Sequence, residues 1–330
     1  MTSPLPRPAR APNTPPASFG EDAVAWAMWL YYAEGRTQNE VAQTLGVSRA
    51  SVANYLSEAR RRGLVSINMQ PDVLAGVELG RRLSERYGLA GAHVVPVGEG
   101  EEEDAAELRR RLGAAGGHVL RPRLRTDTVL GVAWGRTMLA LAQALPEQSL
   151  PELRVVQVSG SSLGGDEYSP EFCTGLIATR LGARCENFHA PAIVSSREMR
   201  DALLAEPGIA RQLSRIKTCD IVVFGVGELD VAVVFSDPDF LTKATVAQYL
   251  AKEAVGVMIG RFIDAQGEEI EGPLSGRQIG IELDALRAAP ERICVAGGPR
   301  KLGAIRAILA AGYATHLVTD AGTARRLAED

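Results

Sequence analysis

The chain has 330 residues, of which 46% are hydrophobic and 23% charged, and its formal net charge is −4 at pH 7. This length predicts two domains with ample core-forming material, and the composition is typical of a soluble globular protein. The acidic balance excludes a general polyanion binder. No apolar run reaches transmembrane length and the amino terminus lacks a hydrophobic signal core, so we expect a cytoplasmic protein without membrane contact.

Cysteine and histidine usage bears on cofactors. The four cysteines are far apart and form no C-x-x-C pair, and the four histidines lie in no metal or nucleophile constellation. We therefore expect no metal and no cofactor, and cysteines that are reduced and buried in the core, namely Cys173, Cys185, Cys219 and Cys294.

The amino-terminal segment divides into a tail and a helix. Residues 1–19 contain six of the 18 prolines and few residues that could be buried, so this tail is predicted to be disordered. Residues 21–34 are predicted to form a helix that is apolar on nearly all sides, with Glu21 and Asp22 at its amino terminus.

Residues 37–62 carry the pattern of a helix-turn-helix. Thr37 and Glu40 form a capping box at the start of a short helix, and Gly46 can adopt the positive φ that ends it. Ser48 caps a second helix whose inward stripe includes Val52 and Leu56. An ordinary α-hairpin is the alternative, but capping, turn and charge together favour a unit that reads DNA.

The charge of this segment supports the same interpretation. Residues 47–66 contain four arginines and one acid, a local balance of +3 in an acidic protein, as expected for a patch that contacts phosphates. We expect bases to be read near the start of the second helix and phosphates to be bound near its end. The predicted DNA-binding residues are Thr37, Arg49, Ser51, Asn54, Tyr55, Arg60, Arg61 and Arg62.

A connector follows this unit. Gly63 should end the second helix, and residues 65–69 alternate as a short strand. Pro71 and Asp72 then open a helix that ends at Gly88, with an inward stripe of Val73, Val77, Leu83 and Tyr87. We place the domain boundary here, with a helix-turn-helix domain at residues 20–70 and an effector and oligomerisation domain at 71–330.

From residue 92 onward, strands and helices alternate. Strands rich in Val and Ile between helices predict an α/β fold with a doubly wound, mostly parallel sheet that is covered on both faces. The predicted strands are 93–97, 128–132, 154–158, 221–224, 257–263, 292–295 and 316–318, and the predicted helices include 102–112, 138–145, 171–181, 199–204 and 302–311.

Four loops at the ends of these strands are rich in glycine or hydroxyl side chains. In open α/β sheets, ligands bind at the carboxyl ends of the strands, where glycine lets the backbone approach and free amides bind anions. Such loops lie at residues 132–137, 158–165, 224–227 and 296–301, and Lys301 adds a positive charge. Each loop alone could be a tight turn, but four on one sheet predict a site for a phosphorylated small molecule.

Several single residues have two interpretations. Asp264 is either a sugar ligand or a turn residue before Gly267, and Asp320 is either an N-cap or a ligand contact. Arg136 and Arg300 could be surface residues. Lys301 could attack a carbonyl only as a desolvated amine with a lowered pKa, which the sequence does not show.

The order of these motifs resembles the SorC family of sugar-binding transcriptional regulators. The resemblance covers about Trp26 to Leu327 and is most specific over 254–320, with Ala254-Val255-Gly256, Gly260-Arg261-Phe262 and Asp264. It implies a bacterial repressor or activator whose effector domain is similar to phosphosugar isomerases and deaminases. It also implies a homotetramer that binds operator double-stranded DNA and responds to a sugar phosphate or polyol.

The family motifs also imply a set of effector contacts. They fall on Gly135, Arg136, Thr137, Gly160, Ser161, Ser162, Gly225, Gly227, Asp264, Gly297, Gly298, Lys301 and Asp320. Val257 stands where the family usually has Asp, which implies fewer hydroxyl contacts. The competing interpretation is a phosphosugar isomerase or deaminase with an accessory DNA-binding domain. Such an enzyme needs an acid/base pair near the sugar carbonyl, and no such pair is visible, so we expect a sensor and no enzyme.

Overall fold

The structure is a computed structural model that describes residues 22–65, 71–96, 104–161, 167–229 and 240–329. The chain divides into two compact units, one up to Gln70 and one from Pro71 onward. The predicted tail at 1–19 and nearly all of the predicted strand at 65–69 lie outside the described residues.

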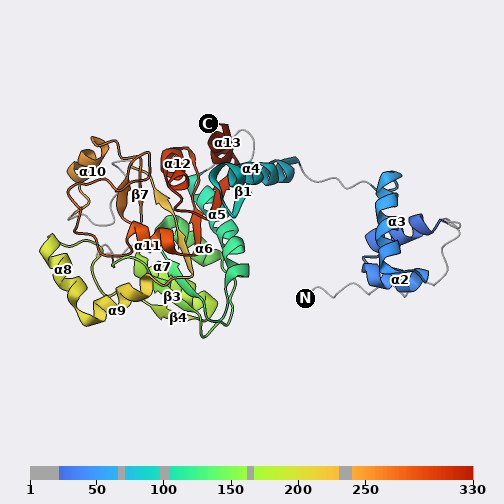
Figure 1. Ribbon diagram of the computed structural model, residues 1–330, viewed down its shortest axis with the longest axis horizontal. Helices are drawn as coiled ribbons and strands as arrows, with labels where there is room; N and C mark the ends of the chain where they lie inside the picture. Colours follow the sequence, from blue (N-terminus) through green and yellow to red (C-terminus); the bar gives the residue numbers. More distant parts are fainter. Residues whose placement is uncertain (1–21, 66–70, 97–103, 162–166, 230–239, 330) are drawn as a thin grey trace. The chain divides into compact units, whose positions relative to one another are not determined.

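The first unit is a small helical domain (Figure 1). Its helices are α1 (Ala23–Met28), which continues as the π-helix η2 (Trp29–Ala33), α2 (Gln38–Leu45) and α3 (Arg49–Arg61). They enclose a core that includes Trp26, Leu30, Val41, Val52 and Leu56. Because the inward residues recur at spacings of three and four, each short helix buries one stripe against the other two.

The ends of these helices follow the sequence pattern. The Asp22 side chain accepts hydrogen bonds at the start of α1, and Thr37 and Glu40 form the predicted capping box on α2. Gly46 ends α2 with φ of +66°, and the Ser48 side chain caps α3. The helix-turn-helix geometry is therefore fixed by local hydrogen bonds and one left-handed glycine.

The second unit is built on a seven-stranded sheet in the order β1-β10-β9-β5-β2-β3-β4, and all of its strand pairs are parallel. This confirms the predicted α/β class with a parallel sheet. The strands are β1 (Gly91–Val95), β2 (Val129–Val132), β3 (Arg154–Gln157), β4 (Arg184–Glu186), β5 (Ile221–Phe224), β9 (Glu291–Val295) and β10 (His316–Asp320).

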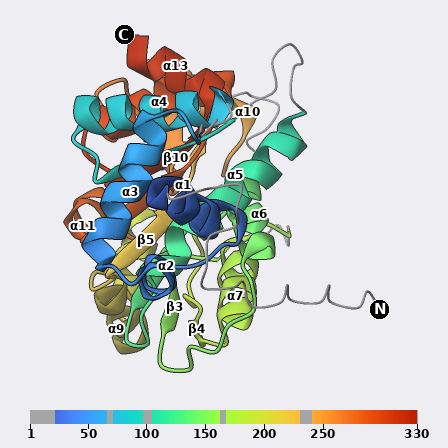
Figure 2. The ribbon, with the colours of Figure 1, turned by 90° about the vertical axis from the view of Figure 1, so that its right-hand side faces the viewer.

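Helices cover both faces of this sheet. Ile221 and Val223 of β5 pack with α5, α6 and α7, whereas Val222 and Phe224 pack on the opposite face with α4, α9, α11, α12 and α13. Figure 2 shows strands between α5–α7 on one side and α9 and α11 on the other. The helices are α4 (Pro71–Tyr87), α5 (Ala105–Leu120), α6 (Arg136–Ala144), α7 (Pro170–Leu181), α8 (Arg197–Ala205), α9 (Pro207–Ile216), α10 (Lys243–Leu250), α11 (Leu283–Ala288), α12 (Leu302–Ala310) and α13 (Ala321–Glu329), with 3-10 turns η3 (Arg121–Arg123) and η4 (Pro299–Lys301).

A small antiparallel sheet corrects one expectation. The segment 257–263, predicted as one strand, is a hairpin of β7 (Gly256–Met258) and β8 (Arg261–Ile263), and β6 (Val226–Gly227) pairs with β7. Ile259 and Gly260 both have positive φ and reverse the chain. The apolar run conceals this turn, because Ile259 is a residue type that rarely adopts the left-handed region.

The connector helix α4 buries part of the predicted stripe. Leu83 is buried and Tyr87 packs half-buried against the core as expected, but Val77 is 68% exposed, and Val73 lies outside the described side chains. The helix also packs Gly76, Leu79 and Gly80 against the rest of the second unit. A Cβ at Gly80 would lie 2.4 Å from the backbone oxygen of Ala92, so the glycine permits close packing of α4 on β1.

The cysteines differ from expectation at one position. Cys173, Cys219 and Cys294 are buried, and burial raises the pKa of each thiol to about 12. Cys185 is exposed on β4.

Candidate functional site

A cavity of about 250 Å³ lies at the carboxyl ends of the parallel strands. The loop after β2 supplies Trp134 and Gly135, the loop after β5 supplies Gly225, and η4 supplies Lys301. The hairpin β7–β8 and the segment 278–281 line the cavity as well. The site therefore lies where the parallel topology brings several strand ends together.

Six of the predicted effector residues line this cavity, namely Gly135, Arg136, Thr137, Gly225, Gly227 and Lys301. Gly135 adopts φ of +110° and precedes α6, and no side chain caps the first turn of that helix. The first-turn amides of α6 are thus not used by a capping side chain and can bind an anion. Val257, the departure from the family pattern, also lines the cavity.

Positive charge dominates the cavity wall. Arg109 from α5, Arg136 from α6 and Lys301 face a single carboxylate, Glu228, and among the described residues none of the four forms an ion pair. Burial lowers the pKa of Lys301, an effect that Glu228 opposes and that Arg109 and Arg136 reinforce. Because an amine is costly to bury without a counter-ion, this geometry favours a bound anion.

The two arginines are held differently. Burial lowers the pKa of Arg109, with Arg136 contributing further, yet a guanidinium remains protonated at any physiological pH. The Arg136 guanidinium lies 5.9 Å from the centre of the Tyr168 ring, which also lines the cavity. Both arginine side chains are therefore fully charged, and both line the same cavity.

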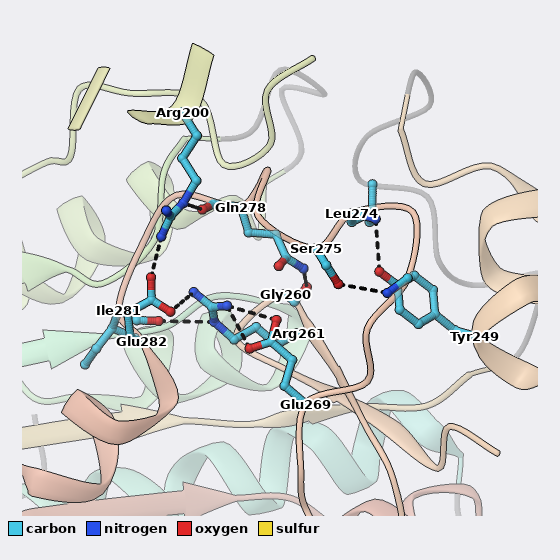
Figure 3. A network of polar contacts seen from close by, with 11 residues as sticks. Arg200, Tyr249, Gly260, Arg261, Glu269, Leu274, Ser275, Gln278, Ile281 and Glu282 are labelled. Carbon is cyan, nitrogen blue, oxygen red and sulfur yellow. Dashed lines mark hydrogen bonds and ion pairs between the residues drawn. The ribbon is translucent and has the colours of Figure 1, made fainter. Parts of the chain in front are cut away.

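A fourth lining cation, Arg261, is already neutralised. Its buried guanidinium pairs with Glu269 at 2.9 Å and with Glu282 at 2.8 Å. Glu282 also binds Arg200 of α8 at 2.6 Å, so one network joins the hairpin to α8 (Figure 3). The positive charge of Arg261 is therefore compensated by two glutamates of the protein and is not available to a ligand.

Two predicted effector residues hold a loop beside the cavity and do not line it. A Cβ at Gly160 would lie 2.3 Å from the carbonyl oxygen of Pro191, so this position is reserved for backbone packing. The Ser161 hydroxyl donates to the carbonyl of Phe188 at 3.1 Å. Their neighbour Ser159 lines the cavity instead, and Ser162 lies outside the described residues.

Four other predicted effector residues build turns and are not among the residues that line the cavity. Asp264 accepts hydrogen bonds from the amides of Gln266 and Glu268, which is the turn alternative. Asp320 accepts from the amides of Gly298 and Thr323, which is the N-cap alternative. A Cβ at Gly297 would lie 2.4 Å from the Asp320 carboxylate, so Gly297 and Gly298 shape the loop that Asp320 holds.

Several lining residues were missed by sequence reasoning. Arg109 lies within a helix, and Tyr168 and Gln278 lie in segments without a strand-end pattern. Nothing in their local sequence distinguishes them from surface residues. Glu228 could have been found, because it directly follows the Gly225-Val226-Gly227 loop.

The predicted DNA-binding residues fall into two groups on the first unit. Arg49 and Asn54 are exposed on α3, whereas Tyr55 packs against the helical core. The Ser51 hydroxyl pairs with that of Ser48, and Thr37 is engaged in its capping box.

At the end of α3 the arginines are partly neutralised. Arg61 and Arg62 both bind Glu58, at 2.6 and 2.7 Å, and Arg62 also reaches Asp22 at 3.2 Å. Arg60 is exposed and forms no ion pair within the described part of the chain.

A helix-turn-helix unit followed by an α/β unit with a ligand cavity defines a ligand-binding transcriptional regulator. Residues 72–329 match the family described as "Putative sugar-binding domain", and residues 23–62 match sigma-70, region 4. The chain belongs to this family, the SorC family of sugar-binding transcriptional regulators.

Individual relatives support the assignment. The chain is 35% identical over 311 residues to the uncharacterized transcriptional regulator YjhU of Escherichia coli, covering 94% of this chain and 95% of that protein. It is 31% identical to the deoxyribonucleoside regulator of Bacillus subtilis, covering 91% and 95%. The full-length sorbitol operon regulator SorC from Klebsiella pneumoniae has the same fold, with a TM-score of 0.70 at 24% identity, covering 93% and 98%. No helix in the described ranges is long and apolar enough to cross a membrane.

Proposed function

We propose that this regulator senses a phosphorylated sugar or polyol in the cavity beside Lys301 and changes its affinity for operator DNA in response. The observation that carries the proposal is the charge of the cavity. Three cations, Arg109, Arg136 and Lys301, face one carboxylate, Glu228, and the adjacent first turn of α6 is uncapped. A dianionic phosphate would compensate the excess positive charge of the cavity. It would also accept hydrogen bonds from the first-turn amides of α6.

Relatives' names support the polyol part of the proposal. Besides the deoxyribonucleoside regulator, the chain is 28% identical over 305 residues to the erythritol catabolism regulatory protein EryD of Brucella abortus. One name refers to erythritol, a small polyol, and the other to nucleosides of the sugar deoxyribose. A ligand of this class, carrying a phosphate, fits a cavity of about 250 Å³.

The site favours sensing over turnover. Glu228 is the one carboxylate among the described residues that line the cavity, and histidine does not occur among those lining residues. Isomerisation of a sugar requires groups that both remove and return a proton next to the carbonyl. A single carboxylate opposite three cations is better suited to orienting a ligand.

On the DNA side, we propose that α3 reads the major groove through Arg49, Ser51, Asn54 and Tyr55, and that Arg60, Arg61 and Arg62 contact phosphates. Thr37 would contribute at the start of α2. The regulator would act in the cytoplasm as a homotetramer, with pairs of helix-turn-helix units on operator half-sites.

Calorimetry with a panel of sugar phosphates, the corresponding free sugars and inorganic phosphate tests the proposed ligand. We expect phosphorylated compounds to bind and free sugars to bind at least tenfold more weakly. Lys301→Met should weaken binding of every phosphorylated compound at least tenfold, whereas Lys217→Met, at an exposed lysine after α9, should not. Equal binding of free and phosphorylated sugars would refute the anion site, and product in the incubations would refute the absence of turnover.

A further inference from the structure

The turn of the β7–β8 hairpin contains an unusual residue. Met258 pairs with Arg261 across the hairpin, which leaves a two-residue turn between them. Ile259 and Gly260 occupy this turn, with φ of +48° and +78°. A turn with two positive φ values most often carries Asn-Gly, because a β-branched side chain is strained in the left-handed region. The geometry of the turn alone therefore does not explain an isoleucine at position 259.

The turn is fixed by its neighbours. The carbonyl oxygen of Gly260 accepts a hydrogen bond from Gln278 Nε2 at 2.8 Å. The next residue, Arg261, is bound by two glutamates, as Figure 3 shows. A Cβ at Gly260 would lie 3.3 Å from the ring of Trp134, which lines the cavity. The hairpin turn therefore has one position, beside the Trp134 ring.

Three apolar side chains near this turn remain partly accessible in the cavity wall. Ile259 packs in part against the main core, but it is only half-buried and it lines the cavity. Val257 and Leu241 also line the cavity, are half-buried and pack around Phe262. Each of the three thus keeps surface that a bound molecule can contact.

The charged and the apolar parts of the wall come from different parts of the fold. The three cations belong to α5, α6 and η4, which surround the parallel sheet. Val257 and Ile259 belong to the small antiparallel sheet and its turn, and Leu241 precedes α10. A hydroxyl group placed against such an apolar surface loses its hydrogen bonds to water without replacement, whereas a methyl group is stabilised by leaving water.

We propose that Ile259, Val257 and Leu241 form an apolar subsite for a terminal methyl group of the phosphorylated ligand. The regulator then prefers a deoxy sugar phosphate or deoxy polyol phosphate to its fully hydroxylated counterpart. This inference rests on the proposed function and deepens it, since it narrows the class of phosphorylated ligand. The cations bind the phosphate, and the apolar subsite distinguishes ligands by the carbon that lacks a hydroxyl group.

The test compares two pairs of compounds whose members differ by one terminal hydroxyl group. D-Fucose 1-phosphate is D-galactose 1-phosphate without its terminal hydroxyl, and propane-1,2-diol 1-phosphate is glycerol 3-phosphate without its terminal hydroxyl. Calorimetry on the full-length wild-type protein should show the deoxy member of at least one pair bound roughly tenfold or more tightly than its partner.

Ile259→Asn separates the side chain from the turn. Asn adopts the left-handed region readily and precedes glycine in the preferred form of this turn, so the variant should fold without a fall in melting temperature. Its affinity for the preferred deoxy compound should fall roughly tenfold, and its affinities for the hydroxylated partner and for inorganic phosphate should be unchanged. Val257→Thr, which keeps a β-branched side chain in β7 and adds a hydroxyl, should narrow the preference in the same way.

The matched control is Glu253→Asn. Glu253 is the one other non-glycine residue with positive φ among the described residues, at +60°, and it is exposed and does not line the cavity. This substitution should relieve a similar backbone strain, raise the melting temperature and leave the preference for the deoxy compound unchanged. The two Asn variants together distinguish relief of backbone strain from loss of apolar surface.

The wild-type protein alone can overturn the inference. Equal affinity within both pairs, or tighter binding of the hydroxylated members, would exclude an apolar subsite. Binding of other sugar phosphates without binding of either deoxy compound would exclude it as well.

The variants provide a second way to overturn it. Equal losses for both members of a pair in Ile259→Asn would show that Ile259 serves core packing only. A preference that persists in both Ile259→Asn and Val257→Thr would show that these side chains do not read the methyl group. If Lys301→Met still weakens binding in these cases, the anion site stands while the apolar subsite falls. If no phosphorylated compound binds, both fail.

Discussion

At the scale of single residues, Glu58 sets the charge that α3 can present to DNA. Hydrogen bonds from Arg61 and then Arg62 lower the pKa of Glu58 to about 2, so its carboxylate is ionised throughout the pH range of a binding assay. These ion pairs lie at the surface, where solvent screens them, so they add little stability, but they hold two arginines that would otherwise be free to contact phosphates.

Glu58→Gln should therefore strengthen DNA binding for all sequences alike. Releasing Arg61 and Arg62 should steepen the dependence of log affinity on log salt by up to about 2, at roughly 0.9 per phosphate contact. Fluorescence anisotropy between about 50 and 200 mM salt measures this slope. A flatter slope or weaker binding would show that Glu58 orients the arginines productively.

Base-reading and phosphate-contacting residues should behave differently. Arg49→Ala or Asn54→Ala should cost about 1–3 kcal/mol on the preferred site and relax specificity at one position. Arg61→Ala should instead weaken all sequences similarly and flatten the salt dependence. Titrations against a set of single-base variants of the preferred duplex compare the two classes, and identical behaviour would contradict the assignment.

Lys301 should make ligand affinity and stability respond to pH in opposite directions. Burial lowers its folded-state pKa below 10.5, so between the lowered value and 10.5 the unfolded state binds the extra proton. The contribution of Lys301 to the free energy of unfolding therefore rises as pH increases through that window. Below the window Lys301 is charged in the folded state too, and burying this ammonium lowers the free energy of unfolding. Anion affinity should fall over the same window, because the neutral amine no longer attracts a phosphate.

Lys301→Met should remove both pH responses. Denaturant unfolding and calorimetry across this window, each compared with Lys217→Met, measure them. A wild-type protein whose anion affinity is flat where Lys301 titrates would contradict the role of this amine.

At the scale of elements, the packing of α5 on α6 positions two cations. A Cβ at Gly113 of α5 would lie 2.5 Å from the carbonyl carbon of Ala140 in α6. Arg109 lies one turn before Gly113 on the same helix, and Arg136 is the first residue of α6. Close approach of the two helix backbones thus sets the separation of the two arginines at the cavity.

Gly113→Ala should destabilise the protein by about 1–3 kcal/mol, because the backbones must separate to admit a methyl group. It should also weaken anion binding by displacing Arg109. Gly175→Ala is the matched control, since a Cβ at this glycine of α7 meets nothing within 4 Å and should stabilise by about 0.5–1 kcal/mol. Urea unfolding of both variants, with ligand titrations, checks the contrast. Unchanged stability of Gly113→Ala would contradict the packing account.

The sequence predicted a helix or strand correctly where one strong local signal, such as a cap, a glycine or an apolar run, determines it. The capping box at Thr37 and the glycine at 46 defined the helix-turn-helix, and runs such as Ile221–Phe224 defined buried strands. The β7–β8 hairpin was missed because its turn uses Ile259. The α4 stripe was right at Leu83 and Tyr87 but wrong at Val77, because Gly76 and Gly80 make the close contact with β1. Strand-end loops placed Gly135 and Lys301 at the cavity, but Arg109 and Gln278 reach it only through tertiary packing.

At the scale of the whole molecule, the two units should be separable. We expect a chain that begins at residue 71 to fold, to bind the same phosphorylated ligand with the affinity of the full-length protein, and to have no affinity for DNA. Circular dichroism, calorimetry and DNA titration together test this. An insoluble fragment, or one that does not bind ligand, would show that the α/β unit depends on the preceding residues.

If the proposed function is correct, the anion bound beside Lys301 controls DNA binding, and a coupled titration of ligand and DNA measures this control. Affinity for a duplex selected from a random library is measured with and without the tightest sugar or polyol phosphate, in the wild type and in Lys301→Met. In the wild type we expect the ligand to change DNA affinity about 5–150-fold, and bound DNA to change ligand affinity by the same factor. The variant should bind DNA as the ligand-free wild type does and should not respond at the same ligand concentration. An unchanged wild-type DNA affinity at saturating ligand, or a full response in Lys301→Met at that concentration, would contradict the claim.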